Sequence, residues 1–367
     1  MGAEVIKIER PKMGDETRQW TPPTFADGTS AYFATVNRNK KSVTVDMASE
    51  QGQSILRRLA QDADIVVENF KVGGLAKYGL DYDSLKAINP GLIYASLTGF
   101  GQTGPDAHKP GYDYIIQGLS GLMSITGPEA GLPHKVGVAV VDLFAGLQLT
   151  IGIQAALLVR AQTGLGQHVD VALLDSALAL TANVGMNCLA SDQVPPRLGN
   201  AHPNIVPYQV FETAGSQHLI LACGNDQQFA AVSQLMGAEW HLDERFATNP
   251  ARVVHREQLI ARMQPLMLSQ NRNEWIALFE SARIPCGPIN NIAEALSMPQ
   301  TKAREMVVDF AFSGSPVKVL GNPIRLSGSP IQYRLAPPML GADTQSVLLS
   351  LGYDPSALAQ WHRQGVI

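Results

Sequence analysis

Cysteine is scarce in this chain: its 367 residues include only three, Cys188, Cys223 and Cys286, and no CxxC pair. An odd number of widely separated cysteines excludes a disulfide framework and a zinc ribbon, and it favours a reducing, cytoplasmic location. Charged residues make up only 16% of the chain, and 28 basic against 32 acidic residues give a net charge of −4. This balance argues against nucleic acid or an anionic membrane surface as the main partner.

The chain also lacks the short motifs of several enzyme classes. It has no HExxH, no P-loop, no GxSxG and no cluster of His and Cys ligands. Metal-dependent hydrolysis and serine-hydrolase chemistry therefore have no support, and we expect no metal site. No signal peptide is expected, and 45% hydrophobic residues are enough for a large core, which excludes disorder.

Only one apolar stretch, residues 136–159, approaches the length of a membrane-spanning helix. It contains Asp142, Gln148, Gln154 and three glycines, which a lipid-facing helix rarely tolerates at mid-depth. We therefore expect it to be a buried segment of a soluble protein.

The first part of the chain alternates β-like and helical patterns. Ser49 is a suitable N-cap for a helix that extends to about residue 62. The run 64–69 is typical of a parallel strand buried on both faces. This alternation predicts an α/β protein with a doubly wound parallel sheet. Further strands are expected at 3–9, 42–46, 92–97 and 169–173, and further helices at 82–89, directly after Asp142 and at 176–190.

The composition changes near residue 191, where a segment rich in Pro, Asn and Gly predicts a linker. Beyond it, a strand at 218–223 and three helical patterns indicate a smaller α+β segment. The C-terminal part again contains both patterns, with a β-like run at 306–312 and a predicted helix at 344–351. The expected division is a large domain at 1–190, the linker at 191–207, a small α+β domain at 208–300 and a C-terminal segment at 301–367.

Residues 99–104 match the dinucleotide-binding pattern GxGxxG and follow a predicted strand. That pattern requires a helix to begin within it, so that the helix N-terminus meets the pyrophosphate. Here the residues at 105–110 are typical of a loop. The pattern therefore favours a plain glycine loop over a dinucleotide site.

Asp142 is the most informative residue, because it stands alone within an apolar run. A buried carboxylate is costly unless something satisfies it. One interpretation is an N-cap, since Asp directly before a long helix is favoured. The other is catalytic: a poorly hydrated carboxylate held ionised by a helix N-terminus suits a nucleophile or a base. The two interpretations do not exclude each other.

Other polar residues occupy loop and linker positions. Tyr112 and Asp113 are interpretable as a core aromatic and a helix cap, or as part of a site. His202 lies in the linker, where a histidine is more often structural than catalytic, although this position could bring it to an interdomain cleft. Four cations flank the early strand ends and are either solvated charges or phosphate ligands: Arg10, Arg38, Lys40 and Lys41.

Taken together, these segments resemble the class III coenzyme A transferases, the family that includes formyl-CoA transferase and carnitine CoA-transferase. No single motif is decisive, but their joint order and spacing are highly specific and extend over essentially the whole chain. The resembling segments are residues 2–9, 37–46, 64–70, 96–105, 110–114, 140–146, 163–171, 199–203 and 284–288.

The resemblance implies a Rossmann-like large domain built from both chain ends, with the small domain inserted between them, and an interlocked homodimer. It implies transfer of CoA from an acyl-CoA to a free carboxylic acid through an aspartyl anhydride and thioester. The linker is similar to that of transferases acting on short dicarboxylates such as succinate or glutarate. Coenzyme A and acyl-CoA are then substrates, with small carboxylic acids as the other partners.

The resemblance also assigns roles to residues. Asp142 matches the catalytic aspartate. Tyr32, Tyr112 and Asp113 match positions that line the reacting acyl group, and His202 is added as a substrate-site candidate. The CoA-binding positions implied are Arg10, Val45, Asn69, Phe70, Lys77 and Tyr78.

Two departures leave alternatives open. Family members usually begin with a further strand and helix, which we expect this chain to lack, so a catalytically defective, truncated relative is one alternative. A glycine-rich lid like that of formyl-CoA transferase is also not found between residues 200 and 224. The racemases of the same superfamily, which act on 2-methylacyl-CoA, are the other. They have a His-Asp pair where this chain has Tyr112-Asp113, and without that imidazole proton abstraction lacks its second base. The residues favour transfer.

Overall fold

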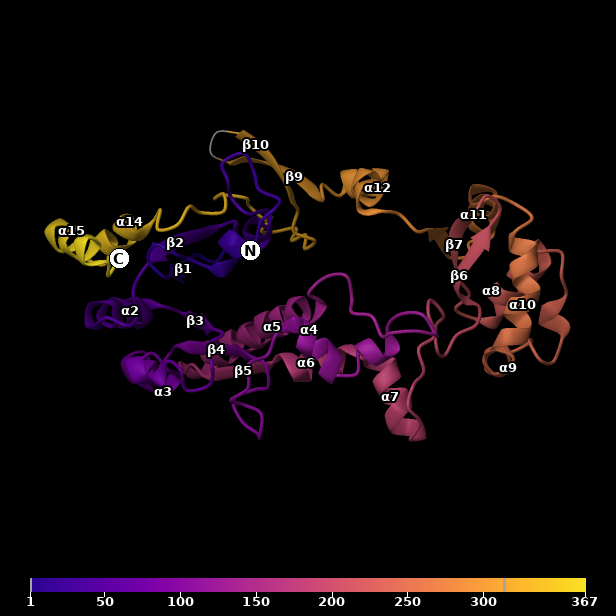
Figure 1. Ribbon diagram of the computed structural model, residues 1–367, viewed down its shortest axis with the longest axis horizontal. Helices are drawn as coiled ribbons and strands as arrows, with labels where there is room; N and C mark the ends of the chain where they lie inside the picture. Colours follow the sequence, from indigo (N-terminus) through magenta and orange to yellow (C-terminus); the bar gives the residue numbers. More distant parts are fainter. Residues whose placement is uncertain (1, 313–314) are drawn as a thin grey trace. The chain divides into compact units, whose positions relative to one another are not determined.

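The computed structural model describes residues 2–312 and 315–367 (Figure 1). The chain forms two compact units, each described by itself. Unit 1 comprises Met1–Thr98, Leu149–Asp170 and Ile292–Ile367, and unit 2 comprises Gly99–Gln148 and Val171–Asn291. The long helix α5 (Val140–Thr163) and strand β5 (His168–Ala172) contribute residues to both. The domain boundaries expected from the sequence stay a prediction.

Unit 1 is built from both ends of the chain. Its strands are β1 (Val5–Glu9), β2 (Lys40–Thr44), β3 (Ile65–Glu68), β4 (Ile93–Thr98), β9 (Val307–Phe312) and β10 (Ser315–Leu320). Its helices are α1 (Ala31–Asn37), α2 (Glu50–Asp62), α3 (Tyr82–Ile88), α12 (Ile292–Ser297), α13 (Pro299–Ala303), α14 (Thr344–Ser350) and α15 (Pro355–Gln364), with short 3-10 helices η1 (Glu16–Gln19) and η2 (Ala76–Tyr78).

The two chain ends meet at strand β2, which pairs in parallel with β1. The C-terminal helices α14 and α15 lie beside these strands (Figure 1). The Thr344 hydroxyl accepts a hydrogen bond from the Thr44 backbone N–H at 2.9 Å, and Asp343 accepts one from the Ser42 N–H at 2.9 Å. Their shared core contains Val43, Val45, Ile55, Val347, Leu348, Leu358, Val366 and Ile367.

A second sheet of unit 1 has the order β3-β4-β5, with β3 and β4 parallel. Mixed α/β structure with parallel strands therefore agrees with the sequence. Helix α2 begins where predicted, because the Ser49 hydroxyl accepts from the Gly52 N–H at 3.0 Å. The prediction that β3 is buried on both faces is wrong for the single chain, since Val67 is 58% exposed.

Unit 2 contains an antiparallel sheet, β6 (Tyr208–Thr213), β7 (Gln217–Ala222) and β8 (Cys286–Pro288), covered by helices. The Arg252 side chain is fully buried there, and its guanidinium donates to the carbonyls of Val206 and Phe246 and to Asp226. The helices of this unit are α4 (Asp113–Leu119), α6 (Leu173–Leu180), α7 (Ala182–Ser191), α8 (Asp226–Leu235), α9 (Asn249–Val254), α10 (Arg256–Met267) and α11 (Arg272–Ser281), with η3 (Met123–Ile125) and η4 (Trp240–Leu242).

The single helix expected at 176–190 is broken into α6 and α7, which meet at 79°. Ala182 has φ 46°, a left-handed conformation that an α-helix does not contain. The segment between α7 and β6, residues 192–207, forms no helix or strand, and its role as a linker stays a prediction.

Helix α5 is apolar over most of its length yet is largely exposed in the single chain. Only 22% of its most apolar window of 18 residues is buried. The prediction that this stretch is buried is therefore wrong for the isolated chain. Within the described residues α5 is long and apolar enough to cross a membrane, and the bent pair α6 and α7 passes the same test as one span. Its exposed side chains include Leu143, Leu147, Ile151 and Leu158.

Candidate active site

The candidate site in unit 2 begins where a glycine loop meets helix α4. The GxGxxG residues form a loop with no helix in it, as predicted. A Cβ added to Gly99 would lie 2.6 Å from the Cα of Gly111, so only glycines allow these two segments to touch. Gly111 precedes Tyr112 and Asp113, and the contact therefore fixes the start of α4.

Asp113 caps the N-terminus of α5 from a different helix. Its Oδ2 accepts a hydrogen bond from the Val141 N–H at 2.8 Å and from the Asp142 N–H at 3.2 Å. These are first-turn N–H groups that have no partner inside the helix. The interpretation of Asp142 as the N-cap is wrong: α5 begins at Val140, and Asp142 lies in its first turn.

The pKa of the Asp142 carboxyl group is raised to about 6, first by partial desolvation and second by the negative charge of Asp113. Asp142 is an exposed residue in the single chain, so the desolvation of its carboxyl group is only partial. We expected the free N–H groups of a helix N-terminus to hold Asp142 ionised. Those groups are bound to Asp113 instead, so they do not offset the desolvation and the negative charge that raise the pKa of Asp142. At neutral pH most molecules still carry the ionised form.

Gln117 completes this arrangement and was not found from the sequence. Its side chain is fully buried, and its Nε2 donates to Asp113 Oδ1 at 2.5 Å. Its Oε1 accepts from the Val136 N–H at 2.9 Å. The spacing of Asp113 and Gln117, four residues apart on one helix face, is the sequence signal that was available.

Tyr112 lies directly before α4 and is 71% exposed. Tyr32, in unit 1, is 49% exposed and packs edge-on against Trp20, with ring centroids 4.8 Å apart. Both side chains are therefore accessible in the single chain. Their assignment to the acyl site stays a prediction.

Unit 1 contains a cavity of about 500 Å³ at the carboxyl ends of three strands. Arg10 follows β1, residues 45–48 follow β2, and Phe70 with Lys71 follows β3. Ligands of parallel α/β sheets bind at this edge. Five of the six predicted CoA-binding residues line the cavity, namely Arg10, Val45, Phe70, Lys77 and Tyr78; the sixth, Asn69, is an exposed neighbour of Phe70.

The cavity carries cations that are suited to anionic ligands. Lys7 is bound to Asp15 at 2.5 Å. Burial alone would raise the pKa of Asp15, but hydrogen bonds from Lys7 and Thr17 lower it to about 2, so the pair is ionic at neutral pH. In the described part of the chain, no ion pair within 4 Å involves Arg10, Lys71 or Lys77.

The other three predicted phosphate ligands do not line this cavity. Arg38 donates to the Leu320 carbonyl at 2.6 Å. Lys40 donates to Asn37, and burial together with the charge of Lys7 lowers its pKa to about 8. Lys41 pairs with Glu4 at 2.5 Å. These cations serve local structure.

His202 has local partners in unit 2. Its Nδ1 accepts from the Asn204 N–H at 3.1 Å, and its ring lies 5.1 Å from that of Tyr208. Burial, followed by the charge of Arg256, lowers the pKa of His202. These contacts agree with a structural role, and its role in substrate binding stays a prediction.

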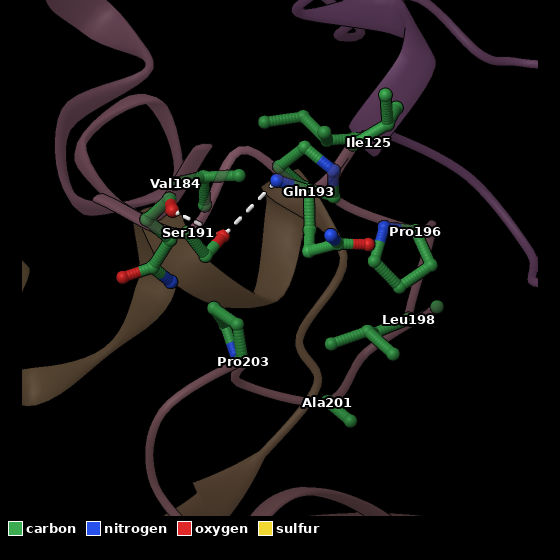
Figure 2. A pocket seen from close by; sticks show the side chains of 12 residues that line it. Ile125, Val184, Ser191, Gln193, Pro196, Leu198, Ala201 and Pro203 are labelled. Atoms are coloured by element: carbon green, nitrogen blue, oxygen red, sulfur yellow. Dashed lines mark hydrogen bonds between the residues drawn. The ribbon is translucent and has the colours of Figure 1, made fainter. Parts of the chain in front are cut away.

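A smaller pocket of about 240 Å³ lies between the end of α7 and the segment that follows it (Figure 2). Ile125, Val184 and Leu198 supply apolar walls, and Ser191 binds the Gln193 N–H at its rim. None of the predicted site residues lines this pocket. Among the described residues, no group of three His, Cys, Asp or Glu side chains suited to a metal ion is found.

The fold and the site define an α/β protein with a strand-end cavity for an anionic ligand and a carboxylate in the first turn of a long helix. The family model CoA-transferase family III matches residues 1–344. The chain belongs to this family and is a CoA-transferase.

Two curated relatives and one solved structure show how close the likeness is. A succinate–glutarate CoA-transferase of Agrobacterium fabrum is 48% identical over 96% of this chain and 89% of its own length. A succinyl-CoA:glutarate CoA-transferase of Mus musculus is 40% identical over 100% of this chain and 84% of its own. A crystal structure of a CAIB/BAIF family protein from Brucella suis is 47% identical, with a TM-score of 0.82 over 95% of this chain and 92% of that one.

Proposed function

We propose that the protein transfers CoA from an acyl-CoA to a short dicarboxylic acid, with Asp142 as the nucleophile. The observation that carries this is that Asp142 lies in the first turn of α5, where its N–H is bonded to the Asp113 carboxylate and the charge of that carboxylate helps to raise its pKa. A carboxylate that is ionised at pH 7 but has a raised pKa is more basic, and therefore more nucleophilic, than an ordinary surface aspartate.

Four steps conserve atoms and charge without an external proton. The Asp142 carboxylate attacks the thioester carbonyl, the C–S bond breaks, and CoA leaves as a thiolate. The thiolate then attacks the aspartyl carbonyl of the anhydride and releases the donor acid as a carboxylate. An acceptor carboxylate attacks this aspartyl thioester and expels the thiolate. Finally, the thiolate attacks the acceptor's acyl carbonyl and frees Asp142.

The strand-end cavity of unit 1 is proposed to hold the CoA nucleotide. The pyrophosphate and the 3′-phosphate of CoA are anions, and Arg10, Lys71 and Lys77 offer charges that form no ion pair within the described chain. Phe70, 44% exposed, offers an aromatic face for the adenine base. CoA is a substrate in this proposal, and the reaction needs no metal ion.

Succinate and glutarate are proposed as acids because the curated relatives carry them in their names. The test supplies succinyl-CoA and glutaryl-CoA as donors to a panel of free acids: succinate, glutarate, oxalate, butyrate and formate. Mass spectrometry follows each new thioester. Transfer to glutarate or succinate at least about tenfold more efficient than to butyrate supports the proposal. Efficient transfer to butyrate with none to the diacids would refute the assignment of the acids.

A racemase activity is the second candidate that the sequence left open. Tyr112 occupies the position before Asp113, where the racemases have a histidine, and a phenol does not supply the imidazole base that proton abstraction needs. Proton exchange at C2 of a 2-methylacyl-CoA in heavy water measures this activity directly. The transferase proposal expects slow or no exchange.

The protein is further proposed to be an interlocked homodimer with a Rossmann-like large domain, located in the cytoplasm. The exposed apolar residues of α5 support a second copy as their cover, because large exposed apolar patches mark interaction surfaces. The three free cysteines suit a reducing compartment. Light scattering on dilution tests the dimer, since an interlocked pair should not release a folded monomer. A compact monomer at micromolar concentration would refute it.

A further inference from the structure

Gln117 is a neutral residue buried between two strong hydrogen-bonding groups. Its Nε2 lies 2.5 Å from Asp113 Oδ1, and its Oε1 lies 2.9 Å from the Val136 backbone nitrogen. The side chain is 0% exposed. Water therefore does not replace either partner, and both bonds depend on this one side chain.

The two partners fix the direction of the amide group. A carboxylate only accepts hydrogen bonds and a backbone N–H only donates, so reversing the amide would place acceptor against acceptor and donor against donor. A glutamate at this position would accept from Val136 as well as Gln117 does. While ionised, however, it would have no hydrogen to donate to Asp113.

Through this bond the Asp113 carboxylate is held on both oxygens. Gln117 donates to Oδ1, and the N–H groups of Val141 and Asp142 donate to Oδ2. Three donors on two oxygens leave one orientation of the carboxylate. The helix turn that carries Asp142 is bound to that orientation.

The same side chain also fixes the approach to α5. Val136 lies four residues before the start of the helix, and the Val140 N–H bonds to the Val138 carbonyl at 2.8 Å. Gln117 is therefore bonded, directly or through Asp113, to the chain on both sides of the helix start. A shift of Gln117 would move both anchors.

We propose that Gln117 is a positioning residue of the transferase: it fixes the Asp113 carboxylate against the N-terminus of α5 and thereby places the Asp142 carboxylate for attack. This rests on the proposed nucleophilic role of Asp142. Gln117 itself does not touch the reacting atoms; it acts through Asp113.

The proposal has a consequence for protonation. The groups that set the pKa of Asp142 are the surrounding protein atoms, which desolvate it, and then the Asp113 carboxylate. If the bond from Gln117 is lost, the Asp113 carboxylate is no longer fixed beside the first turn of α5. Its negative charge then acts more weakly on Asp142, and the pKa of Asp142 falls.

The test compares Gln117→Met with Gln117→Glu. Methionine removes both bonds at similar volume. We expect kcat at pH 7.5 to fall at least about tenfold, with KM for acyl-CoA within about twofold, because the nucleophile is displaced while the nucleotide cavity is intact. The acid limb of the pH profile should also move to lower pH. Gln51→Met and Gln51→Glu, on the exposed first turn of α2, control for the substitutions themselves.

Gln117→Glu separates positioning from simple tethering. The ionised glutamate still accepts from the Val136 N–H. If only this bond to residue 136 matters, activity should stay near that of the unaltered protein at every pH. Positioning through Asp113 predicts low activity at pH 8, and a ratio to the unaltered protein that rises as pH falls, because protonated Glu regains a donor. Melting curves at each pH restrict the comparison to folded protein.

A second readout does not depend on turnover. Carbodiimide modification of Asp142 in the free protein, followed by mass spectrometry across pH, reports its protonation directly. A lower midpoint in Gln117→Met supports the proposal, and if that variant does not fold, the pH dependence of Gln117→Glu decides. Folded variants with unchanged kcat and an unchanged midpoint would overturn it. Absence of CoA transfer in the unaltered protein would instead overturn the proposed function. The carbodiimide midpoint would still test whether Gln117 fixes Asp113 beside Asp142.

Discussion

Replacing Asp142 by Asn separates the chemistry of this carboxylate from its structural effect. An amide of the same shape cannot form the anhydride or the aspartyl thioester, so turnover should fall by roughly three orders of magnitude or more. Stability should not fall, because Asp113, not Asp142, caps α5. The variant is therefore expected to be folded and inactive.

The sign of the stability change follows from the raised pKa of Asp142. The folded protein holds the proton up to about pH 6, and the ordinary value is 3.8. Above pH 6 the ionised carboxylate therefore disfavours the folded state. A shift of about two units is worth roughly 3 kcal/mol for a fully buried group, and solvent screening at the exposed edge reduces this to about 1 kcal/mol or less. Asp142→Asn should gain up to that amount at pH 7.5 and nothing below pH 3.8.

Urea unfolding at pH 7.5 and pH 3.5 measures the stability, and a hydroxylamine trap measures the chemistry. Anhydrides and thioesters react with hydroxylamine, whereas resting carboxylates do not. In the presence of acyl-CoA, a hydroxamate should form on the peptide that contains Asp142 and should be missing in Asp142→Asn. Intact mass excludes deamidation of the new Asn. Normal turnover of the variant, or a label on another residue of an active protein, would refute the mechanism.

Three further predictions concern substitutions of Tyr112, Lys77 and Glu9. Tyr112→His should lower transfer and introduce slow C2 proton exchange on a 2-methylacyl-CoA; rapid exchange by the unaltered protein would contradict the transferase assignment. Lys77→Ala should raise KM for acyl-CoA about three- to tenfold with kcat little changed, and an unchanged KM would argue against the unit 1 cavity as the nucleotide site. Glu9→Gln breaks the two-bond contact with Arg18 and should cost about 3 kcal/mol of unfolding free energy at pH 7. Burial would raise the pKa of Glu9, but bonds from Arg18 and Ser42 lower it, so this contribution should fade as pH falls below 4.5; an equal loss at pH 7 and pH 3 would refute the assignment.

Most strands and helices of the first hundred residues were predictable because their signals are local, although helix α1 (Ala31–Asn37) was not predicted. Ser49 is followed by helical spacing of apolar residues, and the structure has α2 there. The β-branched run after Asp64 became β3. The cavity residues were predicted through the resemblance to the CoA-transferases. The structure places Arg10, Val45 and Phe70 each after a strand end, although these strands belong to two separate sheets.

The predictions that were wrong concern features that depend on contacts between distant segments. Asp142 had the local pattern of an N-cap, but Asp113, 29 residues earlier, occupies that role. No local rule distinguishes these outcomes, because a cap requires only an oxygen near the free N–H groups. The burial expected for α5 failed for a related reason: apolar composition shows that a surface needs cover but not which chain supplies it.

The separation of the cap, Asp113, and the proposed nucleophile, Asp142, onto two helices has a chemical reason. A carboxylate that caps its own helix has its oxygens bound by N–H groups, which lowers both its pKa and its nucleophilicity. With Asp113 in that role, no hydrogen bond to the Asp142 carboxylate oxygens is found within the described chain, and the neighbouring charge raises its basicity. The helix start is then stable without the nucleophile contributing to it. We therefore expect that Asp142 can be replaced with loss of chemistry alone, whereas replacing Asp113 or Gln117 should alter structure and chemistry together.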